Sequence, residues 1–230
     1  MTDIKLVHVK KDGSTNTESM NVEDVAKLNL NTYLANYIYN IGSKVIRKAK
    51  DSDRPYKSRL AVENNTVVHT DGYVLFRAIP HSKEKLADSP EVYEFLGDNV
   101  QRLEKKEDTL NQLYPNYKGI IENFGTTQKD KESDNVNKLM GYYLKNGLDF
   151  TVVFDGIREP YLTTAKEALD LKKEVSTNIQ IFNLMLLKSY MRLIGKKNLN
   201  VQEVFIGDEM IKIICENDHS SYELHMVGLS

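Results

Sequence analysis

The first half of the chain alternates apolar and polar residues over several short stretches, which predicts strands. Residues 3–10 alternate in this way and run into Lys11-Asp12-Gly13, a sequence typical of a strand that enters a turn. Similar strand-like stretches, separated by plausible turns, cover residues 58–63, 66–69, 73–79, 92–95 and 100–103. One helix is predicted before them by apolar residues spaced at i, i+4, i+7 and i+11, which are Leu34, Ile38, Ile41 and Val45.

The second half follows a polar connection at residues 122–135. Residues 136–146 predict a helix, residues 150–155 a strand, and residues 177–197 the strongest helix of the chain. Three strands with turns between them are then expected at residues 201–206, 210–216 and 222–227. Helices set among hairpins favour an antiparallel α+β fold over repeated β-α-β units. We therefore expect two domains, at residues 1–122 and 123–230.

Composition limits the classes of protein that this chain represents. Hydrophobic residues make up 40% and charged residues 28% of the 230 residues, as expected of a soluble, folded protein. No apolar run approaches the roughly 20 residues that span a bilayer, so we expect no membrane partner. The single cysteine, Cys215, excludes an intramolecular disulfide and fits a reducing cytoplasm. The net charge is −2, so binding to DNA would require basic residues gathered on one surface.

Basic residues are gathered on the two strongest helices. Residues 27–50 and 177–197 contain no Asp or Glu, although acidic residues are frequent elsewhere. In the second of these segments, Lys188, Arg192 and Lys196 share one helical stripe, and Phe182, Leu186, Ser189 and Leu193 lie on a different face. One reading is an ordinary solvated helix face. The other is a surface that contacts the duplex backbone without reading sequence, through Lys44, Arg47, Lys48, Lys188, Arg192 and Lys196.

Three segments resemble the bacterial DNA polymerase sliding clamp family. Residues 54–80 contain Arg54-Pro55 and then Thr70-Asp71-Gly72-Tyr73-Val74-Leu75, similar to the family's Thr-Asp-Gly element. Residues 114–121, YPNYKGII, are similar to the segment that links the family's last two domains, and residues 178–229 to the closing half of a clamp. The resemblance covers about two thirds of the chain, and it is poorest in residues 1–25 and 123–175.

The resemblance implies two clamp-like domains, each an antiparallel sheet packed on helices, and a DNA polymerase processivity factor that encircles duplex DNA. Two domains per chain imply a homotrimeric ring, since rings of this superfamily contain six similar domains. It also implies a hydrophobic groove between the halves for peptides of polymerases and clamp loaders. The residues expected to line that groove are Thr70, Gly72, Tyr73, Leu75, Pro115, Ile120, Leu224 and Met226. A clamp of only two domains would suit a phage or mobile element that supplies its own clamp.

The chain departs from the family pattern at three positions. Val74 stands where the family usually has Arg. Glu122 stands where the family commonly has a Pro after the pair of isoleucines, and Val227 replaces the family's Pro near the C-terminus. These differences predict that the groove accepts a different peptide or binds host partners poorly. A clamp-like regulator that keeps the groove but forms no ring is therefore an alternative, and an unrecognised nuclease or hydrolase is a weaker one.

No constellation in the sequence predicts catalysis, a metal or a cofactor. Cys215 lies near His219 and His225, but a cysteine within a strand pattern is far more often buried than nucleophilic. His69 has no second ligand at metal-binding spacing, and the chain has no phosphate-binding glycine motif. The scattered aspartates, Asp149, Asp155 and Asp170, lack the clustering of a two-metal nuclease. We therefore expect a binding protein rather than an enzyme.

Overall fold

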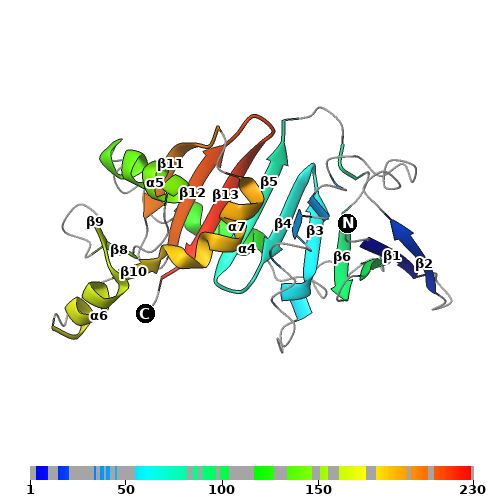
Figure 1. Cartoon of the computed structure of the whole chain (residues 1–230), viewed down its shortest axis with the longest axis horizontal. Coiled ribbons are helices and arrows are strands. Elements are labelled where there is room, and N and C mark those ends of the chain that lie inside the picture. Colours follow the sequence, from blue (N-terminus) through cyan, green and yellow to red (C-terminus); the bar gives the residue numbers. More distant parts are fainter. Residues whose placement is uncertain are drawn as a thin grey trace. The chain divides into compact units, whose positions relative to one another are not determined.

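A computed structural model describes the chain over the following residues: 4–9, 15–20, 34, 37–38, 40–41, 45, 55–81, 85–87, 90–96, 99–103, 117–126, 134–146, 151–154, 161–174, 180–195, 198–206 and 210–228. The chain divides into two compact units (Figure 1). The first unit comprises Met1–Gly72 and Arg77–Tyr117, and the second Tyr73–Phe76 and Lys118–Ser230. The sequence had placed this boundary between residues 122 and 123, and the assignment of the halves to clamp-like domains stays a prediction.

The first unit contains a mixed sheet in the order β5-β4-β3-β6-β7-β1-β2. Its elements are β1 Ile4–Val9, β2 Thr15–Met20, the 3-10 helix η3 Pro55–Ser58, β3 Arg59–Glu63, β4 Thr66–Thr70, the end of β5 Val74–Pro80, β6 Glu91–Leu96 and β7 Asn99–Leu103. The pairs β1–β2, β3–β4, β3–β6 and β6–β7 are antiparallel. The expected antiparallel pairing thus holds for these pairs, and strands β1 and β7 are an exception, since they run parallel with Leu6 aligned to Val100.

The β3–β4 hairpin follows from the two asparagines at its tip. Asn64 and Asn65 have φ angles of 47° and 63°, in the left-handed region that asparagine tolerates better than most residues. The Asn65 side chain also accepts a hydrogen bond from the backbone N–H of Leu86 at 3.0 Å.

The described residues of the predicted N-terminal helical stripe, Leu34, Ile38, Ile41 and Val45, are all buried.

The second unit contains the sheet β11-β12-β13-β5 and a smaller sheet β10-β8-β9. Its strands are β8 Thr151–Phe154, β9 Tyr161–Thr163, β10 Gln180–Asn183, β11 Asn200–Ile206, β12 Met210–Glu216 and β13 Ser220–Val227. Its helices are α4 Tyr117–Thr126, whose first residue belongs to the first unit, α5 Asp134–Asn146, α6 Ala165–Glu174, the 3-10 helix η4 Leu184–Leu187, and α7 Lys188–Ile194. The three C-terminal strands and the helix over 136–146 confirm the sequence prediction.

One face of the β11-β12-β13-β5 sheet carries the core of the second unit. On β12 the buried residues alternate with half-buried ones, and Ile211, Ile213 and Cys215 are fully buried. They lie opposite Met226, Leu224 and Tyr222 of β13, which are also buried. Phe76 of β5 stacks on Tyr190 of α7 with ring centroids 5.3 Å apart. Its ring centroid lies 6.0 Å from that of Tyr222, in a tilted arrangement. This is therefore the face that α7 covers.

Helix α6 begins with a reciprocal cap. The backbone N–H of Glu167 donates to Thr164 Oγ1 at 3.3 Å, and the backbone N–H of Thr164 donates to Glu167 Oε2 at 3.2 Å. The Thr163 hydroxyl donates to the same carboxylate, and these hydrogen bonds lower the pKa of Glu167. Ala168 then packs with Val153 and Ile181 on the smaller sheet.

The predicted helix over residues 177–197 was wrong in its first part. Gln180–Asn183 form strand β10, which pairs with β8. The Asn183 side chain accepts a hydrogen bond from the backbone N–H of Met185 at 3.0 Å and starts a 3-10 turn. The tighter turn shifts the helical phase, so the buried residues are Leu184, Leu187, Tyr190, Met191 and Ile194. The polar connection is also shorter than predicted, because α4 extends to Thr126 and α5 begins at Asp134.

Candidate functional site

Helix α7 separates its apolar side chains from its basic ones. Tyr190, Met191 and Ile194 are buried, whereas Lys188 and Arg192 are exposed one turn apart. No acidic residue occurs in residues 180–195. The helix therefore presents positive charge on the side away from the Phe76–Tyr190 stack, an arrangement suited to contact with a polyanion.

Only part of the predicted DNA-contacting set can be placed. Lys188 and Arg192 share the exposed stripe of α7. Lys44, Arg47, Lys48 and Lys196 lie outside the described residues. Their assignment to DNA contact stays a prediction.

A tight turn leads from the first unit into strand β5. Gly72 has a φ of 94°, in the left-handed region that favours glycine, and its N–H donates to Thr70 Oγ1 at 3.1 Å. Thr70 is buried, so its hydroxyl holds the turn from within. The Thr-Asp-Gly element thus determines how the chain enters β5.

Two exposed apolar residues of the second unit are joined through their backbones immediately after this turn. The backbone N–H of Val227 donates to the carbonyl oxygen of Tyr73 at 3.0 Å, which joins the end of β13 to the start of β5. The side chain of Tyr73 is 50% exposed and that of Val227 43% exposed. The sequence missed Val227 as a surface residue. Alternation along β13 was the available signal, because Val227 follows Met226 and points to the opposite face.

The other groove residues are less accessible. Leu75, Leu224 and Met226 are buried, and the strand register places Leu224 and Met226 on the face covered by α7. Pro115 lies outside the described residues. Ile120 lies in α4, but its side chain is outside the described part of the chain. The structure therefore brings Tyr73 next to the end of β13, and the lining of a groove by the full set stays a prediction.

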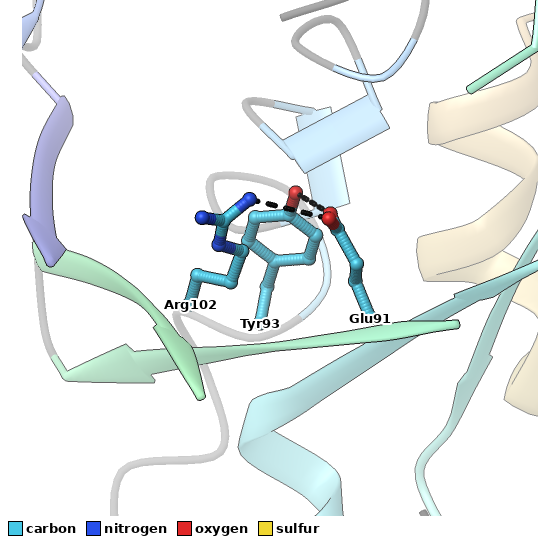
Figure 2. Close-up of polar contacts among 3 residues, drawn as sticks. All are labelled: Glu91, Tyr93 and Arg102. Atoms are coloured by element: carbon cyan, nitrogen blue, oxygen red, sulfur yellow. Dashed lines mark hydrogen bonds and ion pairs between the residues drawn. The ribbon is translucent and has the colours of Figure 1, made fainter. Parts of the chain in front are cut away.

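The first unit contains a polar cluster on the β6–β7 hairpin, shown in Figure 2. The Tyr93 hydroxyl donates to Glu91 Oε2 at 2.5 Å, and Arg102 Nη1 donates to Glu91 Oε1 at 3.2 Å. Tyr93 lies directly opposite Arg102 in the ladder, so the three side chains share one face. Burial, reinforced by Glu91, raises the pKa of Tyr93 far above its usual value. Tyr93 therefore stays a neutral donor and serves to hold the hairpin.

Two further buried groups, Cys215 and His69, have pKa values unsuited to catalysis at neutral pH. Burial raises the pKa of Cys215 to about 12, which keeps it a thiol rather than a nucleophilic thiolate. His69 is buried, and its Nε2 lies 3.1 Å from the carbonyl oxygen of Lys57. Since a carbonyl only accepts, Nε2 carries the proton. Burial lowers the pKa of His69 to about 4, against weaker opposing effects of Lys57 and Asp71.

The described part of the chain contains neither a metal-binding cluster nor a membrane-spanning helix. Among these residues, no cluster of three or more His, Cys, Asp or Glu side chains is arranged to hold a metal ion. Within the same residues, no helix has the length and apolar character needed to cross a membrane.

Comparisons with known proteins return bacterial clamps among solved structures. The structure of the Helicobacter pylori beta clamp with 3,4-difluorobenzamide aligns with a TM-score of 0.41 and 10% identity, over 96% of this chain and 73% of that one. The H. pylori beta clamp bound to a DNA ligase peptide aligns with a TM-score of 0.36 and 9% identity, with the same coverage of both chains. The DNA polymerase III subunit beta from Pseudomonas aeruginosa aligns with a TM-score of 0.37 and 11% identity, over 97% of this chain and 76% of that one. No family model and no curated protein sequence matches the chain.

The buried His69 predicts a loss of stability in acid. The unfolded state takes up a proton at His69 near pH 6.5, but the folded state resists it until about pH 4. The contribution of His69 is therefore fully present above pH 6.5 and is lost as the pH falls from 6.5 towards 4. The loss amounts to up to about 3 kcal/mol.

The measurement is urea unfolding of the parent, His69→Gln and His219→Gln across this range. We expect His69→Gln to remove most of the acid-dependent loss, because glutamine keeps an N–H donor without a proton to gain. The control His219→Gln changes an exposed turn residue and should behave as the parent. Equal pH dependence in all three proteins would contradict the assignment.

Proposed function

We propose that this chain is a sliding-clamp type of DNA polymerase processivity factor that binds duplex DNA without reading its sequence and acts without catalysis. The observation that carries the proposal is helix α7, whose apolar side packs on Phe76 while Lys188 and Arg192 project away from it. The order of the three clamp-like sequence segments supports the same function. The first and last of them meet at the hydrogen bond between Tyr73 and Val227.

The proposed contact with DNA is electrostatic. Lysine and arginine on an exposed helix bind phosphate oxygens and release counterions, whatever the base sequence. Lys44, Arg47, Lys48 and Lys196 belong to the same proposed surface. Such contacts suit a protein that moves along the duplex, because no base-specific hydrogen bond has to be broken at each step.

The proposed ring is a homotrimer of this chain. Among the described strands, β2 ends the sheet order of the first unit and β11 ends that of the second. Exposed edge strands pair readily with another chain, and closure into a ring removes such edges. The resemblance to six-domain rings then gives three copies of a two-domain chain, acting in the cytoplasm.

The proposed docking surface for polymerase and clamp-loader peptides is centred on Tyr73 and Val227. These are exposed apolar side chains on hydrogen-bonded strands, so a peptide anchor could cover both. Leu75, Leu224 and Met226 are buried, so they would stabilise the strands next to this surface rather than touch the peptide. Thr70 and Gly72 would fix the turn that presents Tyr73.

The double variant Lys188→Gln/Arg192→Gln tests the contact with DNA. We expect weaker binding to a blunt duplex of arbitrary sequence, because two phosphate contacts are lost. The slope of log affinity against log salt should fall in magnitude by about 1.8. Fluorescence anisotropy over a salt series measures both quantities.

The matched control is Lys172→Gln/Lys173→Gln, which removes the same number of charges from α6. This control should lose far less affinity than the α7 variant, and its salt slope should stay close to that of the parent. If the α7 variant keeps the parent's affinity and slope, helix α7 does not contact DNA.

Light scattering after size-exclusion chromatography tests the ring. We expect a mass three times the 26.4 kDa of one chain, over a wide range of protein concentration. A closed ring loaded on DNA should remain on a nicked circle and slide off after the circle is cut. A mass of one chain, with no difference between circular and linear DNA, would favour the regulator that forms no ring.

Replacement of the exposed apolar pair tests peptide docking. Tyr73→Ser/Val227→Ser should weaken binding of a labelled DNA ligase peptide, of the kind bound to the H. pylori clamp, by about tenfold or more. The control Leu169→Ser removes an apolar side chain that is 49% exposed on α6. Unchanged peptide affinity in a folded Tyr73/Val227 variant would exclude this surface.

A further inference from the structure

Helix α5 presents an exposed tyrosine between two lysines. Lys138, Tyr142 and Lys145 are spaced at i, i+4 and i+7, so they share one stripe, and all three are exposed. Met140 and Leu144 are buried on the opposite side of the helix. Tyr142 is 61% exposed, more than any other large apolar side chain in the described part of the chain.

Helix α5 covers the same face of the second unit's sheet as α7. At Gly141 the helix approaches β11 so closely that a Cβ there would lie 3.7 Å from Val201 Cγ2. Val201 is paired with Cys215, and Cys215 with Tyr222. Cross-strand partners point to the same face, and Tyr222 contacts Phe76 in the core beneath α7. The exposed stripes of α5 and α7 therefore both point away from this face of the sheet.

The ring of Tyr142 has one aromatic contact that restrains it, although most of it is exposed. It packs edge-to-face with Tyr143, with ring centroids 5.4 Å apart and planes at 88°. The side chain of Asn146 donates to the carbonyl oxygen of Tyr142 at 2.9 Å and secures the last turn of the helix. A restrained aromatic ring loses less conformational entropy on binding than a mobile one does.

The chemistry of this stripe matches that of single-stranded nucleic acid. Surfaces that bind single strands combine aromatic rings, on which bases stack, with basic groups that follow the phosphates. In a duplex the bases are already stacked on each other, so an exposed ring reaches only the backbone. Two lysines flanking one tyrosine favour an anionic partner, and Asp134 is the one acidic residue in the sequence of α5.

We propose that Tyr142 stacks on an unpaired base while Lys138 and Lys145 bind the adjoining phosphates. This inference rests on the proposed function. It assigns α5 to the single-stranded DNA that adjoins the duplex contacted by α7. Helix α5 would thus let the protein distinguish a junction from uninterrupted duplex.

The experiment compares three fluorescent ligands: oligothymidylate, a blunt duplex, and the same duplex with a single-stranded extension. We expect Tyr142→Leu to weaken binding to oligothymidylate by about five- to a hundredfold, the value of one stacked base, and to remove the preference for the extended duplex. Blunt-duplex affinity should stay unchanged. Tyr142→Phe should bind as the parent does, because it keeps the ring.

The matched control is Tyr161→Leu, which removes another tyrosine that is 39% exposed, on β9 of the same unit. Lys138→Gln/Lys145→Gln should reduce the salt slope for oligothymidylate by about 1.4. The proposal is overturned if the parent does not bind oligothymidylate, if Tyr142→Leu binds it as the parent does, or if that variant loses blunt-duplex affinity equally. These outcomes leave the Lys188/Arg192 test of duplex binding intact, so the two proposals fail separately.

Discussion

The stack of Phe76 on Tyr190, with Tyr222 in tilted contact beside it, determines where the charge of the second unit lies. Helix α7 has only seven residues, too few to be stable alone, so its orientation depends on what it buries. Aromatic pairs add about 0.5–1.5 kcal/mol to the burial of their area, and they also fix the rotation of the helix about its axis. Once Tyr190 is held against the sheet, Lys188 and Arg192 must point outward. The electrostatic surface is therefore a consequence of apolar packing.

The same sheet explains why the clamp-like segments provide both core and surface. Phe76 is buried in the core from β5, whereas Tyr73, in the bend just before that strand, is half exposed. On β13 Leu224, His225 and Met226 are buried, and Val227, the last residue of the strand, is exposed. A motif read along the sequence mixes these two roles, since neighbouring residues of a strand serve opposite faces. Residues that sequence analysis grouped as one groove are thus divided between the core and the surface.

Much of the fold could be predicted from local pattern, and the failures have identifiable causes. The three C-terminal strands and α5 follow directly from their periodicity, and the stripe that begins at Leu34 is buried as predicted. Strand β10 was missed because its pairing with the distant β8 overrides an apolar run that also suits a helix. The parallel pairing of β1 with β7 joins strands far apart in sequence, and no local signal predicts it. For the proposed site, the exposure of Lys188 and Arg192 on one stripe could be predicted from charge and spacing, and their contact with DNA stays a prediction. The exposure of Val227 and Tyr142 required knowledge of which faces are covered.

Weak contacts are a requirement of the proposed function rather than a defect of it. In the proposal, the two cations on α7 would contribute a salt-sensitive affinity for DNA that decreases steeply at physiological ionic strength, so one isolated chain would dissociate quickly. Stronger or base-specific contacts would retain the protein but would halt its movement along the duplex. In the proposed ring the topological link retains the protein, and three copies of each helix present their charges to one duplex at high effective concentration. Retention and mobility are then provided by different parts of the molecule, the strand edges and the basic helices.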